Sequence, residues 1–450
     1  MAKNKLFRVL SLMVTIVMIA SMVIGCGGNS TKENTGETAV SAGQETTKQE
    51  PGETAAGDKG KKVEITYWNG FTGSDGATLT ELVNKYNAED NAATIKMEIM
   101  PWDSLYQKLT STIATGQGPD IVAFSSPRIG SYAKPGAIVP LADAFNKGVD
   151  LNVIPKGYQD ILKYDNEFYA VPMNFATIML YYNKDMFSKA GLDPEKAPED
   201  WSQLAEYARK LTKVNGKNVE QYGFGIASKE TIAMWPELIW GNGGDLIDYQ
   251  NMKSVINSEQ SIGAVQYFAD LILKDKVSPP VLTGAEVDKL FETQKCAMYM
   301  CGPWAAGTFQ KSGVNFGVAP VPKGPAKKAT LGDAVVMVMT KNCENKDAAY
   351  DFFKFWNSKE TQTTWSLQTG FPPARTDLTE DAQLKTNPYV VAFAGEANDA
   401  QFYLNKLTNF GEIENNVLVP AYEKILLGKS SVKDALDEAA KKMDELLNNQ

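Results

Sequence analysis

The chain has 450 residues, a formal net charge of −9 at pH 7 and no histidine. This acidic balance disfavours a nucleic-acid-binding protein, because neutralising phosphates requires an excess of Lys and Arg. The lack of histidine excludes Ser-His-Asp and Cys-His nucleophilic sites, histidine-ligated zinc, and imidazole acid–base catalysis. We expect no metal and no cofactor, and any catalysis would depend on carboxylates, Lys or Tyr.

The amino terminus has the pattern of a secretory signal. Its first eight residues include three basic side chains and no acid, and residues 9–24 are almost wholly apolar but too short to be trusted as a membrane span. The segment ends in Val23-Ile24-Gly25-Cys26, which resembles the lipobox of bacterial lipoproteins. We expect residues 1–25 to be a lipoprotein signal peptide and Cys26 to carry a diacylglyceryl group, with a retained N-terminal membrane helix as the alternative. Because residues 1–25 carry three positive charges and no negative ones, their removal changes the net charge from −9 to −12.

Residues 26–61 predict a disordered tether to the lipid. They are rich in Gly, Thr, Glu, Lys and Ser, and contain no aromatic residue and one branched aliphatic, Val40. Such a segment cannot bury enough apolar surface to offset the entropy of ordering it. The three other cysteines, Cys296, Cys301 and Cys343, are too few for a disulfide framework and are expected to be buried core residues.

From Lys62 the sequence alternates strand and helix patterns. Apolar residues at every second position from 63 to 67 predict a strand, and Asn69 to Gly76 forms a Gly-rich turn before a helix. This turn has neither the dinucleotide fingerprint nor the P-loop Lys-Ser/Thr, so we interpret it as a ligand-facing connection. The series continues with a strand at 95–99, a helix at 105–113 and a strand at 121–124. This order predicts a parallel sheet with ligand groups at the carboxyl ends of its strands.

The stretch from Glu167 to Lys184 predicts a junction between two lobes. A short strand at 169–171 is followed by Pro172, which cannot donate to a strand ladder, and then by a second apolar run from Ile178. A strand pair inside one domain is the alternative reading of this stretch. Downstream, Trp201 and Trp356 lie on amphipathic helix patterns, which favours a place in the core. The pattern predicts helices near 201–211, 262–272, 352–356, 365 and 431–446, and strands near 297–300, 316–319 and 334–339.

The order of motifs resembles the maltose-binding-like, family 1 extracellular solute-binding proteins of ABC importers. The resemblance covers about residues 62 to 450 and depends on the order of the motifs behind a lipobox. The motifs are Ile65-Thr66-Tyr67-Trp68-Asn69-Gly70, Gly118-Pro119-Asp120-Ile121, Tyr169-Ala170-Val171-Pro172, Tyr182-Asn183-Lys184, Gly302-Pro303-Trp304 and Phe371-Pro372-Pro373-Ala374-Arg375.

The resemblance implies an α/β fold of the two-lobed periplasmic-binding-protein type (class II). Each lobe is expected to be a mainly parallel sheet flanked by helices, with three hinge crossovers. The first lobe would comprise residues 62–175 and 334–370, and the second lobe residues 176–333 and 371–450. The protein would then be a monomer on the outer face of a bacterial, Gram-positive membrane, where it delivers a mono- or oligosaccharide to an ABC permease.

The resemblance also implies ligand contacts. An aromatic ring covers the apolar C–H face of a pyranose, while carboxylates, amides and Arg bind its hydroxyls. Pro127 and Ala176 stand where maltose binders can carry acids, so the sugar itself stays open. The candidate ligand-binding residues are Trp68, Asn69, Phe71, Thr72, Phe124, Ser125, Arg128, Asn174, Glu230, Trp235, Asp245, Trp304 and Arg375.

Two alternatives to sugar capture remain open from the sequence. A carboxylate-dependent carbohydrate-active enzyme would need two acids about 5 to 10 Å apart across the sugar, and Glu230 with Asp245 is the one pair that can be nominated. A binding protein for a sugar phosphate or a polyol is the other alternative.

Overall fold

The computed structural model describes residues 62–449, except 217 and 230–233. The expected signal peptide, the tether with Cys26, and Glu230 therefore lie outside the described residues. Within the described part of the chain, no helix is both long enough and apolar enough to cross a membrane.

The first third of the folded chain forms three parallel strands, as the sequence predicted. β1 pairs in parallel with β2, where Ile65 lies opposite Ile95, and with β3, where Tyr67 lies opposite Ile121. The intervening helices bury the apolar residues that define their pattern. These elements are β1 (Val63–Asn69), α2 (Ser74–Ala88), β2 (Ala93–Ile99), α3 (Trp102–Ile113) and β3 (Ile121–Ser125).

Three later strands complete this sheet and make it mixed. β14 (Thr330–Met339) pairs antiparallel with β3 and, along its other edge, with β6 (Val171–Thr177). β15 (Ala400–Phe402) pairs in parallel with the first residues of β14. Because β14 runs opposite to both β3 and β6, β6 has the same direction as β1, β2 and β3. The sheet is therefore mainly parallel, as expected, with β14 and β15 reversed.

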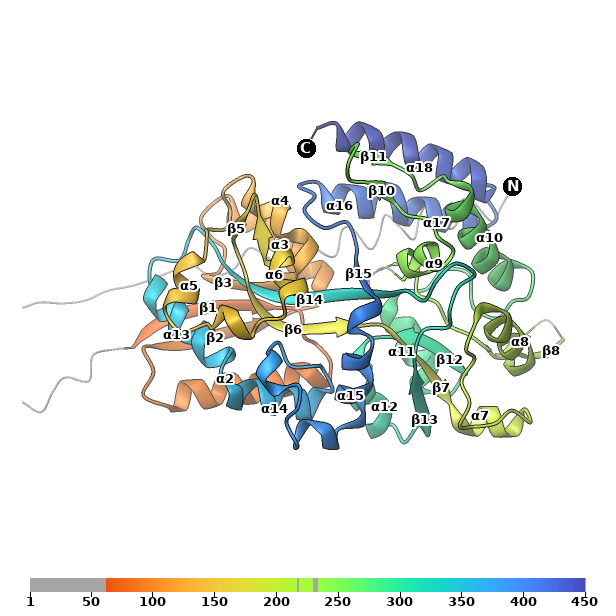
Figure 1. Cartoon of the computed structure of the whole chain (residues 1–450), viewed down its shortest axis with the longest axis horizontal. Helices are drawn as coiled ribbons and strands as arrows, with labels where there is room; N and C mark the ends of the chain where they lie inside the picture. Colours follow the sequence, from red (N-terminus) through yellow and green to blue (C-terminus); the bar gives the residue numbers. More distant parts are fainter. Residues whose placement is uncertain (1–61, 217, 230–233, 450) are drawn as a thin grey trace, which may run out of the picture. The chain divides into compact units, whose positions relative to one another are not determined.

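Pro172 lies inside β6, where the sequence predicted an interruption. The register of β6 against β14 shifts between Val335 and Val336, so that Asn174 faces Val335 and Pro172 faces Val336. Such a bulge accommodates a residue that has no N–H to donate. β7 (Met179–Asn183) begins two residues after β6 ends and belongs to a different sheet, so the chain leaves the large sheet at Ile178 (Figure 1).

The smaller sheet has the order β12-β7-β13 and is antiparallel, which corrects the expected parallel arrangement. Both β12 (Met298–Cys301) and β13 (Phe316–Ala319) pair antiparallel with β7. They run in the same direction and are connected through η4 (Pro303–Ala305) and α12 (Ala306–Lys311), but β7 is inserted between them. The sequence shows the crossover from β12 to β13 and carries no local signal for the inserted strand.

The predicted helices of the second half are present. They are α8 (Trp201–Leu211), α10 (Glu259–Leu273), α13 (Lys346–Trp356), α14 (Lys359–Thr369) and α18 (Val432–Leu447). Gly370 ends α14 with a φ of 84°, a left-handed conformation that favours glycine.

The remaining elements are short. The helices are α4 (Ile129–Ala133), α5 (Ala142–Asn146), α6 (Lys156–Gln159), α7 (Lys184–Lys189), α9 (Trp235–Gly241), α11 (Gly284–Glu292), α15 (Pro388–Gly395), α16 (Phe410–Glu412) and α17 (Val419–Leu426), with the turns η1 (Ser126–Arg128) and η8 (Ile413–Leu418, a π-helix). The hairpins pair β4 (Lys163–Tyr164) with β5 (Glu167–Phe168), β8 (Lys213–Asn215) with β9 (Asn218–Gln221), and β10 (Ile247–Asp248) with β11 (Lys253–Ser254).

Buried apolar side chains form two large clusters. The first core contains residues between 65 and 176 and between 334 and 374. The second core contains residues between 178 and 331 and between 403 and 447, and a smaller third cluster surrounds β7, β12 and α11. The chain therefore alternates between the two large cores. Trp356 in the first core and Trp201 in the second are buried, and all three described cysteines are buried and free, as predicted.

Candidate functional site

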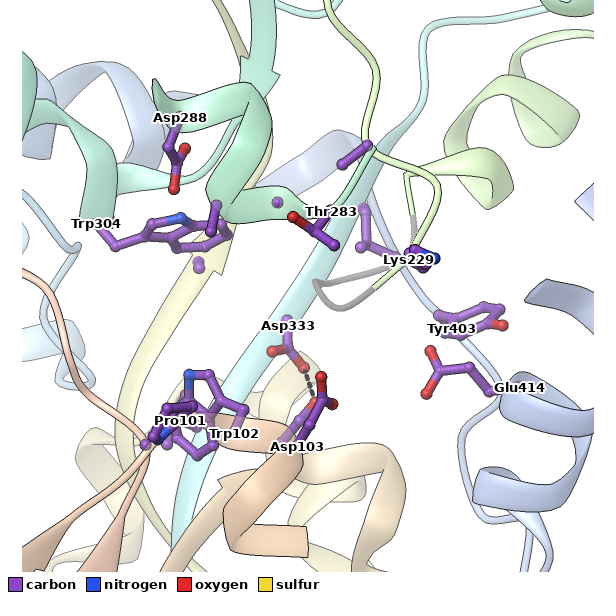
Figure 2. Close-up of a pocket in the computed structure, with 18 of the residues that line it drawn as sticks. Pro101, Trp102, Asp103, Lys229, Thr283, Asp288, Trp304, Asp333, Tyr403 and Glu414 are labelled. Carbon is purple, nitrogen blue, oxygen red and sulfur yellow. Dashed lines mark hydrogen bonds between the residues drawn. The ribbon is translucent and has the colours of Figure 1, made fainter. Parts of the chain in front are cut away.

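A pocket of about 430 Å³ is lined by residues of both large cores (Figure 2). The loops that follow β1, β2 and β3 all contribute to it, which agrees with the rule that ligand groups gather at the carboxyl ends of parallel strands. The segment from Tyr403 to Tyr422 contributes from the second core. A volume of this size suits a ligand of a few tens of atoms.

Trp304 is held over the pocket by close packing against its own turn. Gly302 ends β12 and Pro303 opens η4, so the chain turns sharply before the indole. A Cβ on Gly302 would lie 1.9 Å from the Trp304 ring, so only glycine allows this approach. Trp304 is half-buried and packs against all three clusters. It lines the pocket with one part of its ring available to a ligand.

Trp102 has the matching position on the first core, and the sequence analysis missed it. It follows β2 in Met100-Pro101-Trp102, an arrangement that resembles Gly302-Pro303-Trp304 after β12. A Cβ on Gly70 would lie 2.0 Å from the Trp102 ring, so this indole also packs against a glycine. Trp102 stacks on Tyr106 and is half-buried (Figure 2). The Pro-Trp pair at the end of a predicted strand was the signal that could have found it.

The loop after β1 brings Phe71 and Thr72 to the pocket, as predicted. Phe71 meets Trp102 edge to face at 5.4 Å between ring centroids. Asn69 does not line the pocket; it is fully buried, and its Oδ1 accepts a hydrogen bond from the Phe71 N–H. Asn69 therefore shapes the loop.

Arg128 lines the pocket and connects the two cores. Its guanidinium lies 3.7 Å from the centre of the Tyr106 ring and 4.9 Å from that of Phe410. Its Nη2 is 3.2 Å from Oε2 of Glu414, which belongs to η8. Burial opposes the charge of Arg128, but Tyr106 and Glu414 raise the pKa of its guanidinium. Burial raises the pKa of Glu414 to about 7, while Arg128 lowers it.

Ser125 and Asp333 meet in the same region of the pocket. Ser125 donates from Oγ to Oδ1 of Asp333 at 2.8 Å, the dashed contact in Figure 2. Burial raises the pKa of Asp333 to about 7, although this hydrogen bond and Arg128 lower it. Asp103, at the start of α3, also lines the pocket, where its charge contributes to raising the pKa of Glu414.

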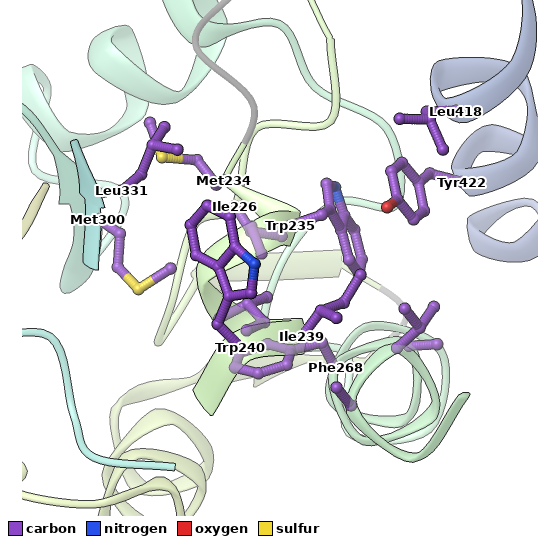
Figure 3. Packing of buried hydrophobic residues seen from close by; sticks show 14 of the residues in the cluster. Ile226, Met234, Trp235, Ile239, Trp240, Phe268, Met300, Leu331, Leu418 and Tyr422 are labelled. Carbon is purple, nitrogen blue, oxygen red and sulfur yellow. The ribbon is translucent and has the colours of Figure 1, made fainter. Parts of the chain in front are cut away.

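Asn174 and Trp235 line the pocket with donors that have no partner among the described residues. Asn174 is fully buried on β6; its Oδ1 accepts from the Val335 N–H at 3.4 Å, and its Nδ2 is unpartnered. Trp235 is 1% exposed and stacks on Tyr422 with 4.7 Å between ring centroids (Figure 3). Its indole N–H is likewise unpartnered.

Two further carboxylates of the pocket were missed by the sequence analysis. Asp75 begins α2, and its Oδ1 accepts a hydrogen bond from the Gly76 N–H at 2.8 Å. Burial raises the pKa of Asp75 to about 6. Burial likewise raises the pKa of Asp288 to about 6, while Tyr299 and Cys301 lower it by hydrogen bonding. Within the described residues, no group of three or more acidic or thiol side chains could hold a metal ion.

Several predicted site residues lie outside this pocket. Trp68 is buried beneath the Lys108 ammonium, and Phe124 is fully buried against Tyr132. Arg375 binds Asp377 and the carbonyl of Asn357. The side chains of these three residues therefore contact neighbouring residues of the fold and do not line the pocket. Glu230 cannot be placed, since it lies outside the described residues.

Asp245 lines a second pocket of about 240 Å³ with Trp240 and Tyr249. Its Oδ1 accepts hydrogen bonds from the Trp240 indole at 3.0 Å and from the Leu246 N–H at 2.8 Å. In the polar turn that suggested a ligand contact, this carboxylate therefore forms hydrogen bonds with neighbouring residues of the same segment. Asp245 also does not line the larger pocket, where Asp245 and Glu230 would have to act together as the two acids of an enzyme.

Comparison with known proteins identifies relatives along most of the chain. The family of bacterial extracellular solute-binding proteins matches residues 71–363. The sn-glycerol-3-phosphate-binding periplasmic protein UgpB of Brucella melitensis is 27% identical over 409 residues, which cover 85% of this chain and 92% of that protein. UgpB of Rhizobium meliloti is 25% identical over 402 residues, with 84% and 92% covered.

Solved structures show the same fold. An ABC transporter solute-binding protein from Thermotoga lettingae bound with alpha-D-tagatose superposes with a TM-score of 0.79 at 21% identity, over 86% of this chain and all of that one. Maltose-bound MalE3 of T. maritima superposes with a TM-score of 0.77 at 23% identity, over 85% of this chain and all of that one. The mixed α/β architecture is that of the two-lobed periplasmic binding proteins.

Proposed function

Because the chain belongs to the family of bacterial extracellular solute-binding proteins, we propose that it captures a sugar in the 430 Å³ pocket and delivers it to an ABC permease. The observation that carries this proposal is the pair of half-buried indoles, each packed on a glycine: Trp102 beside the first core, and Trp304 where all three clusters meet. Indole faces cover the apolar C–H faces of pyranose rings.

Polar groups between the indoles suit the hydroxyl groups of a sugar. Ser125, Asn174 and Arg128 line the pocket as candidate contacts, together with the carboxylates of Asp288 and Asp333. A sugar hydroxyl both donates and accepts, so it can pair with carboxylates and with the unpartnered donors of Asn174 and Trp235. Phe71, Thr72 and Trp235 complete the set of sequence-predicted contacts that line the pocket.

Binding is proposed to close the pocket. The proposed hinges are the chain crossings near Ala176, Asp333 and Gly370. The first two lie where one core gives way to the other, and the third lies shortly before the first core ends at Ala374. A sugar that contacts both cores gains its second set of contacts only when they approach, and this difference in affinity shifts the population toward the closed form. A permease that contacts both lobes could then distinguish loaded from empty protein.

No catalytic step is required of this chain. A carbohydrate-active enzyme was the second candidate, but the acid nominated for it, Asp245, does not line the larger pocket. Incubation with labelled oligosaccharides should return them unchanged, and measurable turnover would contradict this part of the proposal.

The capture proposal is tested by calorimetry and small-angle scattering together. A screen of mono- and oligosaccharides by thermal shift should yield a ligand, since any ligand specific for the folded state raises its stability. At saturation with that ligand, the radius of gyration should fall. Confirmed binding with an unchanged radius would contradict closure, and a failure of Trp102→Ala and Trp304→Ala to weaken binding would contradict the placement of the site.

The membrane attachment is proposed from the lipobox at Cys26. Two acyl chains retain a protein stably where a single chain does not, so the diacylglyceryl group suffices as an anchor. Cys26→Ala should release the protein from the outer face of the membrane or leave its precursor uncleaved. A variant that is processed and still held on the membrane would contradict the lipid anchor.

A further inference from the structure

The charged residues around the pocket are predominantly acidic. Among the described residues, its lining includes the cations Arg128 and Lys229. It includes more carboxylates than cations: Asp75, Asp103, Asp288, Asp333 and Glu414. Figure 2 shows Asp103, Asp288 and Glu414 on different sides of the cavity, so the excess of acid is not confined to one wall.

Both cations are already paired with carboxylates. Arg128 contacts Glu414 at 3.2 Å, and the two side chains are 13% and 12% exposed. Lys229 Nζ lies 3.0 Å from Oε1 of Glu423, which does not line the pocket. An anionic ligand would have to compete with these carboxylates for its counter-ions, at a desolvation cost that is large for buried charges.

The other pocket carboxylates have no cation within 4 Å in the described part of the chain, and neutral groups contact them instead. Ser125 donates to Asp333, and Cys301 donates to Asp288 at a distance of 3.9 Å. Burial raises the pKa of Asp333 to about 7, although Ser125 and the more distant Arg128 lower it. A cationic group of a ligand would supply the missing partner.

The N-terminus of α2, where a phosphate could bind, already has a carboxylate of its own, Asp75. α2 has 15 residues, and Gly73 and Asp75 at its N-terminus line the pocket. Helix N-termini bind phosphate through such amides. Here the Asp75 carboxylate accepts the Gly76 N–H at 2.8 Å, so the chain provides its own anion at this position.

The pocket nevertheless offers two donors for neutral oxygen atoms. Nδ2 of Asn174 and the indole N–H of Trp235 belong to side chains that are 0% and 1% exposed, and neither has a partner in the described residues. Buried donors of this kind are normally paired, so they indicate ligand acceptors inside the pocket. Hydroxyl or ring oxygens of a sugar would satisfy them.

We propose that the pocket selects sugars by charge and that its preferred ligand carries a protonated amine beside Asp103. An ammonium there would meet a carboxylate with no cation within 4 Å in the described residues, directly after Trp102 in α3, whose indole face also attracts cations. The ranking is therefore amine-bearing sugar first, uncharged sugar second and sugar phosphate last. This inference rests on the proposed capture of a sugar and names the class of that sugar.

The test uses matched sets that differ in one substituent. Calorimetry with the mature protein would compare glucosamine with glucose and glucose 6-phosphate, and the same three derivatives in the galacto and manno series, as monosaccharides and disaccharides. In the series that binds, the amine should bind about tenfold more tightly than its uncharged counterpart. This advantage should shrink with added salt, because screening weakens the attraction of charges.

Two variants locate the amine. Asp103→Asn changes an exposed side chain and should reduce the amine preference several-fold without loss of stability. Asp288→Asn, the matched control at the Trp304 side of the pocket, should retain the amine preference. An Asp103→Asn protein with an unchanged preference would overturn the placement of the amine.

The outcomes separate this inference from the proposed function. An uncharged sugar or a sugar phosphate as the tightest ligand would overturn the charge ranking and leave sugar capture standing. Failure of every sugar in the panel to bind would contradict both proposals.

Discussion

Arg128 and Glu414 form an ion pair of 3.2 Å between elements that are 286 residues apart in the sequence. Arg128 ends η1, next to the large sheet, and Glu414 lies in the π-helix η8 beside the second core. The pair therefore joins the two cores at the edge of the pocket, with the guanidinium packed between the rings of Tyr106 and Phe410. π-helical turns are often found at functional sites.

Arg128→Ala should destabilise the protein, since it leaves Glu414 buried without a counter-ion. We expect the free energy of unfolding to fall by about 3 kcal/mol above neutral pH. The loss should be smaller in mild acid, because the pKa of Glu414 is already raised to about 7 and protonation removes its charge. Urea unfolding at the two pH values measures both effects.

The control for Arg128→Ala is Lys433→Ala, which breaks an exposed pair with Asp437. Exposed pairs contribute less than about 1 kcal/mol. An Arg128→Ala protein no less stable than this control, or equally destabilised at both pH values, would show that the buried pair does not connect the cores as described.

The local sequence pattern predicted most helices and strands of this fold but not which strands pair with one another. β1, α2, β2, α3 and β3 follow from residue periodicity, because each buries one face against its immediate neighbours. The insertion of β7 between β12 and β13 depends on contacts made across more than a hundred residues, and no local residue signals it. The expected parallel direction of that sheet was wrong for this reason.

The residues of the candidate site were likewise predicted only in part. Trp304 and Arg128 were predicted from the family resemblance and line the pocket, but Glu414 lies on a helix and only the fold brings it to Arg128. The turn around Asp245 has the composition of a ligand-binding loop, yet the Asp245 carboxylate accepts a hydrogen bond from the Trp240 indole. A single sequence shows which side chains could bind a sugar and does not show which of them have other partners.

Truncation of either indole should weaken sugar binding more than it weakens the fold. We expect Trp304→Ala and Trp102→Ala each to cost about 1 to 3 kcal/mol of binding free energy, measured by calorimetry. Since both rings are half-buried, the ligand-free protein should lose only about 1 kcal/mol of stability. Trp356→Phe is the contrasting variant: its indole is fully buried and donates to the Met173 carbonyl, so it should lose stability and retain affinity. The reverse result would place Trp304 in the core.

Gly302→Ala should displace the Trp304 indole, because the added Cβ would lie 1.9 Å from the ring. Gly70→Ala should act in the same way on Trp102, where the distance is 2.0 Å. Both variants should lose affinity for the sugar about as strongly as the corresponding Trp→Ala variant and show altered tryptophan fluorescence. Gly157→Ala is the matched control: nothing lies within 4 Å of its added Cβ, so affinity and fluorescence should stay unchanged. Unchanged affinity in Gly302→Ala would mean that the ring position does not govern binding.

The last prediction concerns Glu237, a carboxylate inside the second core that is 2% exposed. Its Oε2 accepts a hydrogen bond from the Leu331 N–H at 3.2 Å, and its Oε1 has no partner among the described residues. Burial raises the pKa of Glu237 to about 8. This group is therefore protonated in the folded protein at neutral pH and ionised in the unfolded chain.

The sign of the pH effect follows from proton binding. Between the ordinary pKa of Glu and about pH 8, the folded state holds one proton more than the unfolded state at this position, so the contribution of Glu237 to stability falls as the pH rises. Glu237→Gln removes this titration and keeps the side-chain shape. The variant should be more stable than the parent by roughly 2 to 4 kcal/mol near pH 8, and by much less near pH 5.

The control for Glu237 is Glu438→Gln, since Lys424 and Lys442 lower the pKa of Glu438 to about 2 by hydrogen bonding at the surface. Glu438→Gln should lower stability slightly near neutral pH, which is opposite in sign to the change expected for Glu237→Gln. Urea unfolding of the parent and both variants across this pH range gives the comparison. If Glu237→Gln gains no stability relative to the parent as the pH rises, the Glu237 carboxylate is ionised in the folded protein, and a cation or water must reach it inside the second core.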